Sequence, residues 1–170
     1  HSLSVGVASK LIAIEIGVAP KNRECFFIAG LLHDLGKLPL NYTLSDEYVK
    51  AMGISEREQL PLYRSEYRVM GITHAETGKL IAKLWKLGSE IHDAISYHHS
   101  IGAYEGSHGT LVYTVAAADY FSNIYEIGFS GNRHPESIPQ DVLDYLGITL
   151  EQLDDLEDEV LSKIEEAKVF

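Results

Sequence analysis

Apolar residues recur at helical spacing, every three to four positions, along most of this chain, and the strict alternation typical of half-buried strands is nearly absent. The pattern therefore predicts a protein built from helices. We expect helices over residues 2–17, 21–35, 74–87, 89–98, 110–127, 139–146 and 149–167, with shorter helices between 41 and 70. Because each helix has an apolar stripe to bury, the sequence predicts an all-α, single-domain helical bundle over residues 1–170.

Capping and stopping residues mark several of the expected helix ends. Gly17 and Pro20 follow the first helix, and Gly36 and Pro39 follow the second. Helix starts are predicted at Thr73-His-Ala-Glu, Thr149-Leu-Glu-Gln, Ser45-Asp-Glu and Ser55-Glu-Arg-Glu, where a hydroxyl precedes acidic or amide side chains. Residues 100–109 and 128–139 are expected to be loops.

Two segments are expected in the core because of their apolar character. The run from Cys25 to Leu32 is almost wholly apolar, which predicts a central, buried helix. Trp85, with Leu84 and Leu87, is expected to pack in the core rather than to present a binding surface.

Composition excludes several classes of protein. No apolar run approaches the roughly 20 residues of a membrane span. The net charge of −11, without clustered lysine and arginine, argues against binding to nucleic acid. The single cysteine excludes an internal disulfide and suits a reducing cytoplasm, so we expect a cytoplasmic protein.

The acidity is concentrated near the end of the chain. Residues 151–170 hold eight acidic residues against two lysines. A solvated helix face is the favoured interpretation, and an acidic docking surface is the alternative. At the other end, His1 leads directly into an amphipathic pattern, so we expect that a native N-terminal part precedes it.

The chemistry of the chain centres on His33 and Asp34, which end the apolar second helix. Burying an unpaired carboxylate costs several kcal/mol, which a partner charge or a metal ion usually offsets. A carboxylate at such a helix end can also bridge two cations, one oxygen to each. Lys37 follows Asp34 at i+3, so its ammonium is placed to contact a phosphate oxygen beside the metals. Asp34 and Lys37 are the candidate catalytic residues.

Further imidazoles and one carboxylate lie at the ends or on the apolar faces of other expected helices. The candidate metal ligands are His1, His33, Asp34, His74, His98, His99 and Asp119. Five histidines against two aspartates disfavour magnesium and calcium and favour iron, manganese, zinc or nickel, with two ions as the expected number. The alternative for Asp119 is a structural hydrogen bond between helices, and His98 or His99 could orient a partner instead of binding metal.

Other polar residues carry weaker signals. Glu66 and Glu76 could hydrogen-bond helix termini or metal-bound histidines, and a structural role is favoured for both. His92, beside Asp93, is expected to be an exposed helical residue, and His108 a surface loop residue.

The order of these residues resembles the HD superfamily of metal-dependent phosphohydrolases. More narrowly, Gly71-Ile-Thr-His-Ala-Glu with its downstream Trp85, Leu31-Leu-His-Asp-Leu-Gly-Lys, and Ile95-Ser-Tyr-His-His are similar to the HDOD subfamily, over about residues 1–125. The resemblance implies an all-helical bundle and a bacterial signalling or regulatory role, with a protein partner in that pathway. Many HDOD members have lost metal ligands and act without catalysis, whereas every metal position here carries a ligand-capable residue.

The alternative function is an active phosphohydrolase or phosphodiesterase that acts on a nucleotide or cyclic dinucleotide. The related cyclic di-GMP phosphodiesterases carry a Gly-Tyr-Pro element shortly after the paired histidines. Residues 100–109 of this chain lack that element, which argues against cyclic di-GMP as the substrate. The sequence does not distinguish a regulatory domain from an enzyme, and it leaves the substrate, the partner and the oligomeric state open.

Overall fold

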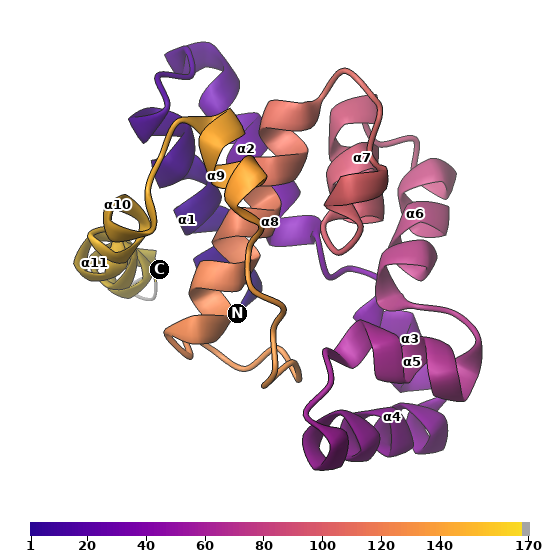
Figure 1. Ribbon diagram of the computed structural model, residues 1–170. Coiled ribbons are helices and arrows are strands. Elements are labelled where there is room, and N and C mark those ends of the chain that lie inside the picture. Colours follow the sequence, from indigo (N-terminus) through magenta and orange to yellow (C-terminus); the bar gives the residue numbers. More distant parts are fainter. Residues whose placement is uncertain (168–170) are drawn as a thin grey trace.

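The computed structural model describes residues 1–167, which form helices and loops without a strand (Figure 1). The helices are α1 (Ser2–Glu15), α2 (Arg23–Leu32), α3 (Lys37–Thr43), α4 (Ser45–Glu58), α5 (Leu62–Met70), α6 (His74–Leu84), α7 (Ser89–Tyr97), α8 (Gly109–Ile124), α9 (Gln140–Leu146), α10 (Leu150–Asp154) and α11 (Glu157–Ala167), with 3-10 turns at Pro20–Asn22 and Ile101–Ala103. The predicted all-α fold class is confirmed.

Helix α1 lies at the centre of the main core and packs against α2, α8 and α11. Val5, Ala8 and Ile12 of α1 are inaccessible or nearly so, and they pack with Ala117 and Phe121 of α8. Helices α9 and α10 add further apolar side chains to this core. The two helices that carry His1 and Asp119 are therefore joined along the most tightly buried part of the molecule.

A smaller layer forms beside this core. Helices α3, α4 and α5 lie together below α6 and α7, as the lower right of Figure 1 shows. Leu40, Tyr48 and Leu62 form its apolar centre. Because α6 and α7 pack against each other and α7 packs against α2 and α8, the hairpin α6–α7 connects the two layers.

Two helix starts predicted from the sequence are capping boxes in the structure. The Thr73 hydroxyl accepts a hydrogen bond from the Glu76 amide, and the Glu76 carboxylate accepts one from the Thr73 amide. Thr149 and Gln152 make the same reciprocal pair at the start of α10. Each pair provides acceptors for two backbone N–H groups that an uncapped helix start would leave without a partner.

Three predicted boundaries are wrong. Pro39 does not end a helix but lies in the first turn of α3. Proline is tolerated there because backbone N–H groups of the first turn make no hydrogen bond within the helix. Ser55 does not start a helix; it lies inside α4, and its hydroxyl donates to the Leu60 carbonyl at 2.6 Å. The predicted helix over 149–167 is broken into α10 and α11. The break places Glu157 and its acidic neighbours in the first turn of α11, where the helix dipole favours negative charge.

The expected burial of two segments is also wrong. Trp85 is 58% exposed and Leu84 is 77% exposed, because the end of α6 projects beyond the helices that cover its other face. Helix α2 buries Phe26 and Ala29 but leaves Ile28 and Leu31 at the surface. Helix α2 therefore buries one face in the core, and its opposite face is exposed to solvent.

No helix within residues 1–167 is both long and apolar enough to span a membrane.

Candidate metal centre

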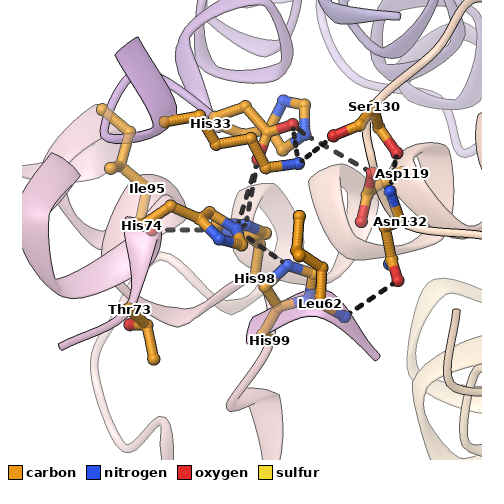
Figure 2. A network of polar contacts seen from close by, with 12 residues as sticks. His33, Leu62, Thr73, His74, Ile95, His98, His99, Asp119, Ser130 and Asn132 are labelled. Atoms are coloured by element: carbon orange, nitrogen blue, oxygen red, sulfur yellow. Dashed lines mark hydrogen bonds and ion pairs between the residues drawn. The ribbon is translucent and has the colours of Figure 1, made fainter. Parts of the chain in front are cut away.

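All seven predicted ligands meet between the main core and the α6–α7 hairpin. Figure 2 shows five of them, His33, His74, His98, His99 and Asp119, close to one another. His1 precedes α1, His33 and Asp34 follow α2, His74 begins α6, His98 and His99 follow α7, and Asp119 lies within α8. Six of the seven residues therefore lie at or next to a helix end, where a side chain can reach along the helix axis into the junction. The side chains of His1, His33, Asp34, His74, His98 and Asp119 are all less than a tenth exposed.

The first half-site consists of His1, His33, Asp119 and one oxygen of Asp34. His1 Nε2 lies 3.0 Å from Asp119 Oδ1 and 3.7 Å from Asp34 Oδ2. His33 Nε2 lies 3.3 Å from Asp34 Oδ2 and 3.4 Å from Asp119 Oδ1. Two imidazoles and two carboxylates thus converge on one point.

The second half-site consists of His74, His98, His99 and the other oxygen of Asp34. His74 Nε2 lies 3.3 Å from His98 Nε2 and 3.0 Å from His99 Nε2. The oxygen Asp34 Oδ1 lies 3.2 Å from His74 Nε2 and 4.0 Å from His98 Nε2. The three rings thus present their Nε2 atoms to one another and to one oxygen of Asp34.

Backbone and side-chain acceptors fix which nitrogen of each ring faces the centre. His33 Nδ1 lies 2.7 Å from the Gly30 carbonyl, and His98 Nδ1 lies 2.9 Å from the Ile95 carbonyl. Since a carbonyl only accepts, each Nδ1 carries the proton and donates it. Both Nε2 atoms are then free to act as ligands when the rings are neutral.

The two half-sites differ in their charge state in the metal-free protein. Burial opposes the charged form of His33, but Asp34 and then Asp119 outweigh it and raise the pKa of His33 to about 10. Burial also opposes ionised Asp34, yet His33 and Lys37 hold its pKa well below the usual range. The first half-site therefore binds a proton between its carboxylates, in the place where a metal ion would otherwise supply the positive charge.

Two rings of the second half-site, those of His98 and His99, are neutral at physiological pH. Burial, followed by the neighbouring His74 ring, lowers the pKa of His99 to about 3. Burial and then the charge of His99 lower the pKa of His98 well below its ordinary value. Unprotonated imidazole is the form that binds metal, so His98 and His99 need no proton loss at neutral pH before they could bind an ion.

Both aspartates are also linked to the loop that follows α8, residues 125–139, which we call the covering loop. Lys37 Nζ donates to Asp34 Oδ2 at 2.7 Å and to the Ser130 carbonyl at 2.9 Å. The Ser130 hydroxyl donates to Asn123 Oδ1 at 2.6 Å, and Asn123 Nδ2 donates to Asp119 Oδ1 at 2.8 Å. Figure 2 shows Ser130 on the opposite side of the centre from His74.

The covering loop is held at its other end by α5. The Leu62 amide donates to Asn132 Oδ1 at 3.1 Å, and Tyr63 donates to Glu136 at 2.8 Å. Arg64 also pairs with Glu136. The loop thus connects the two layers over the centre.

Three clefts border the centre. One, of about 100 Å³, is lined by His98, His99 and Asp119 together with the covering loop. A second, of about 350 Å³, shares His99 and Tyr63 with the first. A third, of about 260 Å³, opens on the other side at Asp34 and Lys37. The ring of Tyr63 stacks on His99 with centroids 4.8 Å apart, which places an aromatic face between the first two clefts.

The backbone of Gly36 lies close against the first turn of α6, which carries His74. A Cβ added at Gly36 would lie 1.9 Å from the His74 carbonyl oxygen and 2.6 Å from the Gly78 nitrogen. No side chain fits between the turn after Asp34 and the first turn of α6, so the glycine is required for this approach.

Some polar partners of the centre were not identified from the sequence. Glu66, for which a structural role was favoured, contacts the predicted ligand His74 directly, whereas Glu76 has the predicted capping role. Asn123 is four residues after Asp119 and so shares its helix face, a spacing that could have indicated it. Ser130 lies in an irregular loop, and no sequence spacing indicated its position.

Two of the three histidines outside the centre, His92 and His108, share one carboxylate. Asp93 accepts hydrogen bonds from the Tyr104 hydroxyl and His108 Nδ1, both at 2.8 Å, and lies 3.3 Å from His92 Nδ1. Both histidines are about a third exposed or less. His108 is therefore a loop residue that anchors its loop to α7, and it does not reach the centre.

Residues 1–101 match the family model of the HDOD domain. The chain belongs to the HDOD domain family. The match ends just after His98 and His99, so it includes six of the seven residues at the centre, and Asp119 lies beyond it.

Solved structures of similar proteins share the fold over nearly the whole chain. An HDOD domain protein of unknown function from Geobacter sulfurreducens is 28% identical, with a TM-score of 0.79 over 98% of this chain and 60% of its own. Proteins from Marinobacter aquaeolei VT8, provisionally named a signal transduction protein, and Shewanella amazonensis SB2B, provisionally named a phosphohydrolase, share the fold at 21% and 18% identity, with TM-scores of 0.74 and 0.66. They are matched over 96% and 95% of this chain and over 36% and 57% of their own.

A curated relative, an uncharacterized protein from Treponema pallidum (strain Nichols), is 27% identical over 126 residues. The match covers 74% of this chain and 24% of that protein. The chain thus spans about a quarter of the curated relative and 60% of the Geobacter structure.

Proposed function

We propose that the centre binds two divalent transition metal ions, one in each half-site, and that Asp34 bridges them. The observation that carries this proposal is the division of the Asp34 carboxylate. Its Oδ2 atom faces His1 and His33, whereas its Oδ1 atom faces His74 and His98. A carboxylate that serves only as a structural anchor would not need imidazole nitrogens on both oxygens.

An unsatisfied polar atom supports the fit to metal. Asp34 Oδ1 is buried without a hydrogen-bond partner, a costly state that coordination would relieve. The ligand atoms of His1, His33 and Asp34 lie within 4.8 Å of one another, and so do those of His74, His98 and His99. This donor set suits iron, manganese, zinc or nickel. Bound ions of this kind would supply Lewis acidity and a binding site for anions.

We infer that the chain is a regulatory HDOD domain with a metal centre, acting through a protein partner in signal transduction. Membership of the HDOD family supports this role, and the provisional name of the Marinobacter relative agrees with it. The centre then serves as a framework that joins the main core to the α6–α7 hairpin, because its ligands come from both. In this role metal binding stabilises the arrangement of helices that the partner contacts.

A phosphohydrolase function is the second candidate, and the position of Lys37 favours it. The Lys37 ammonium lies against Asp34 at the edge of the third cleft, where it can also contact an anionic ligand. The positive charge of two divalent ions would exceed the negative charge of Asp34 and Asp119. The centre would then be cationic and suited to a phosphoester. In this function Lys37 binds a phosphate oxygen, and Asp34 holds the two halves of the centre at a fixed separation.

Metal content tests the centre in both functions. The chain is purified without chelator, and bound iron, manganese, zinc and nickel are measured by mass spectrometry. We expect about two ions per chain in the wild type, and fewer than one in Asp34→Ala and Asp34→Asn. The matched control is Asp46→Ala, which removes an exposed acid from α4. Two ions retained by both folded Asp34 variants would refute the bridged centre.

Turnover separates the two functions. The fully loaded protein is assayed with a generic phosphodiester and with inorganic phosphate as a binding probe. Full metal occupancy without turnover supports the regulatory role, whereas metal-dependent turnover supports the enzyme. In the second case Lys37→Met should weaken phosphate binding while leaving metal content unchanged, and Lys50→Met, on the surface of α4, is its control.

A further inference from the structure

The outer face of α6 carries a cluster of exposed apolar side chains. Leu80, Leu84 and Trp85 are 61%, 77% and 58% exposed. Leu80 and Leu84 are separated by one helical turn, so they lie on the same stripe, and Trp85 extends it at the helix end. Clustered large apolar side chains at a surface are typical of sites that bind another molecule.

Lysines surround these apolar side chains. Lys79, Lys83 and Lys86 give this short segment a local charge of +3 in a chain whose net charge is −11. Within residues 1–167, neither Lys83 nor Lys86 forms an ion pair, while the Lys79 ammonium lies over the Tyr97 ring at 5.7 Å from its centroid. The α6 face is therefore basic and apolar, with two lysines available to an acidic partner.

Helix α11 presents a face of the opposite kind. Asp158, Leu161 and Glu165 follow one another at helical spacing on a single stripe, and Leu161 is 42% exposed. Between residues 151 and 167 eight acidic residues oppose one lysine, Lys163, which pairs with Glu166. An exposed leucine within an acidic surface complements exposed leucines and a tryptophan among lysines.

These two faces cannot meet within one molecule. Figure 1 shows α6 at the right edge of the structure and α11 at the lower left, with α1 and α8 between them. A contact between them therefore requires two copies of the chain. We propose that the basic α6 face of one copy docks on the acidic α11 face of a second copy.

The distribution of charge, and not the net charge, supports a second copy as the partner. The three lysines of the α6 face are matched by the acidic residues of α11, although two copies that each have a net charge of −11 repel each other over longer distances. A second copy brings its acidic surface to the lysines of the first. Because the contact joins two different surfaces, it is heterologous, and it either closes into a symmetric assembly or continues as a chain of copies.

Trp85 is the single tryptophan of the sequence, so its fluorescence reports directly on the proposed contact. We expect its emission to shift to shorter wavelength, and its quenching by acrylamide to fall, as protein concentration rises from micromolar to several hundred micromolar. Sedimentation equilibrium should show association over the same range. Raising the salt from about 50 mM to about 500 mM should weaken it, because the screening length shortens.

Charge reversal tests the pairing of the two faces. The variant K83E/K86E and the variant D158K/E159K should each raise the dissociation constant by about tenfold or more. An equimolar mixture of the two variants should associate again, because the acidic α6 of one now faces the basic α11 of the other. The matched controls, K50E/R57E and D46K/E47K, make the same charge changes on α4 and should leave the dissociation constant within about twofold.

Several outcomes would overturn the proposal. A wild-type chain that remains monomeric at several hundred micromolar excludes it, and so does association that neither reversal affects. A Trp85 shift with phosphatidylserine vesicles, without a shift on self-association, would assign the α6 face to membranes instead. Circular dichroism confirms that each variant is folded, so a loss of association is attributed to the changed surface.

Discussion

The carboxylate of Glu66 binds both the side chain and the backbone of His74. Its Oε2 atom lies 2.6 Å from His74 Nδ1 and accepts from the His74 amide at 2.8 Å, and both side chains are shielded from solvent. Burial would raise the pKa of Glu66, but the charge of His74 and its hydrogen bonds lower it, so the carboxylate remains ionised. An ionised acceptor at Nδ1 directs Nε2 towards the centre.

Glu66→Gln should therefore weaken metal binding at the second half-site by about tenfold, because the amide keeps an acceptor but loses the charge. Metal affinity is measured by competition with a chromogenic chelator. Glu76→Gln is the control, since Glu76 binds the Thr73 amide in the capping box and does not contact a ring at the centre. Equal affinity in the wild type and Glu66→Gln would show that Glu66 has only a structural role.

The two capping boxes allow stability to be separated from effects at the centre. Thr73→Ala and Thr149→Ala each remove a cap and should lower the free energy of unfolding by about 1 kcal/mol. Only Thr73 is adjacent to a residue of the centre, His74, so only its variant should also lower metal affinity. Thermal unfolding and metal titration of the two variants check this, and equal metal affinity in both would contradict it.

Gly36→Ala should destabilise the protein by about 3 kcal/mol or more, because the added Cβ would overlap the His74 carbonyl oxygen and force the half-sites apart. The control is Gly53→Ala. Gly53 lies at the surface within α4, where an added Cβ meets no atom within 4 Å, so the same substitution should stabilise by about 0.5–1 kcal/mol. Denaturant unfolding of the two variants should give changes of opposite sign.

The Asp93 cluster predicts a dependence of stability on acid. Burial opposes ionisation of Asp93, but the hydrogen bond from His108 and then that from Tyr104 hold its pKa below the ordinary value. A lowered folded-state pKa contributes stability that is complete above the unfolded value and is lost as pH falls through the folded value. The contribution is modest because Asp93 is only partly buried, with 22% of its side chain exposed to solvent.

The free energy of unfolding of Asp93→Asn should therefore fall less than that of the wild type between about pH 5 and about pH 2. The variant should be less stable than the wild type at neutral pH, and this difference should shrink as the pH falls. Urea unfolding at a series of pH values measures this. The same series on Asp46→Asn, an exposed acid of α4, should run parallel to the wild type. Parallel curves for Asp93→Asn and the wild type would exclude the predicted contribution.

Periodicity and capping residues predicted much of the fold. The all-α class, the helices around His74 and Asp119 and the two capping boxes follow from local patterns, which depend on residues a few positions apart. The exposure of Trp85 and the break between α10 and α11 do not, because they depend on which helices happen to cover a given face. Local sequence carries little information about that.

The candidate centre shows the same division. His33, His74 and Asp119 could be singled out because polar residues in apolar surroundings indicate a shared site, and the structure brings them together. That Asp34 presents one oxygen to each group of histidines is a property of the assembled helices. The role of Ser130 likewise depends on a loop whose path no periodicity describes.

The hydrogen bonds of Ser130 matter when related chains are compared. Through Lys37 it is linked to Asp34, and through Asn123 it is linked to Asp119, so one loop residue closes a hydrogen-bonded ring around the first half-site. A relative that keeps every histidine and aspartate but changes its covering loop has lost part of this ring. An inventory of ligands alone would count such a chain as intact, although the orientation of both its carboxylates has lost its support.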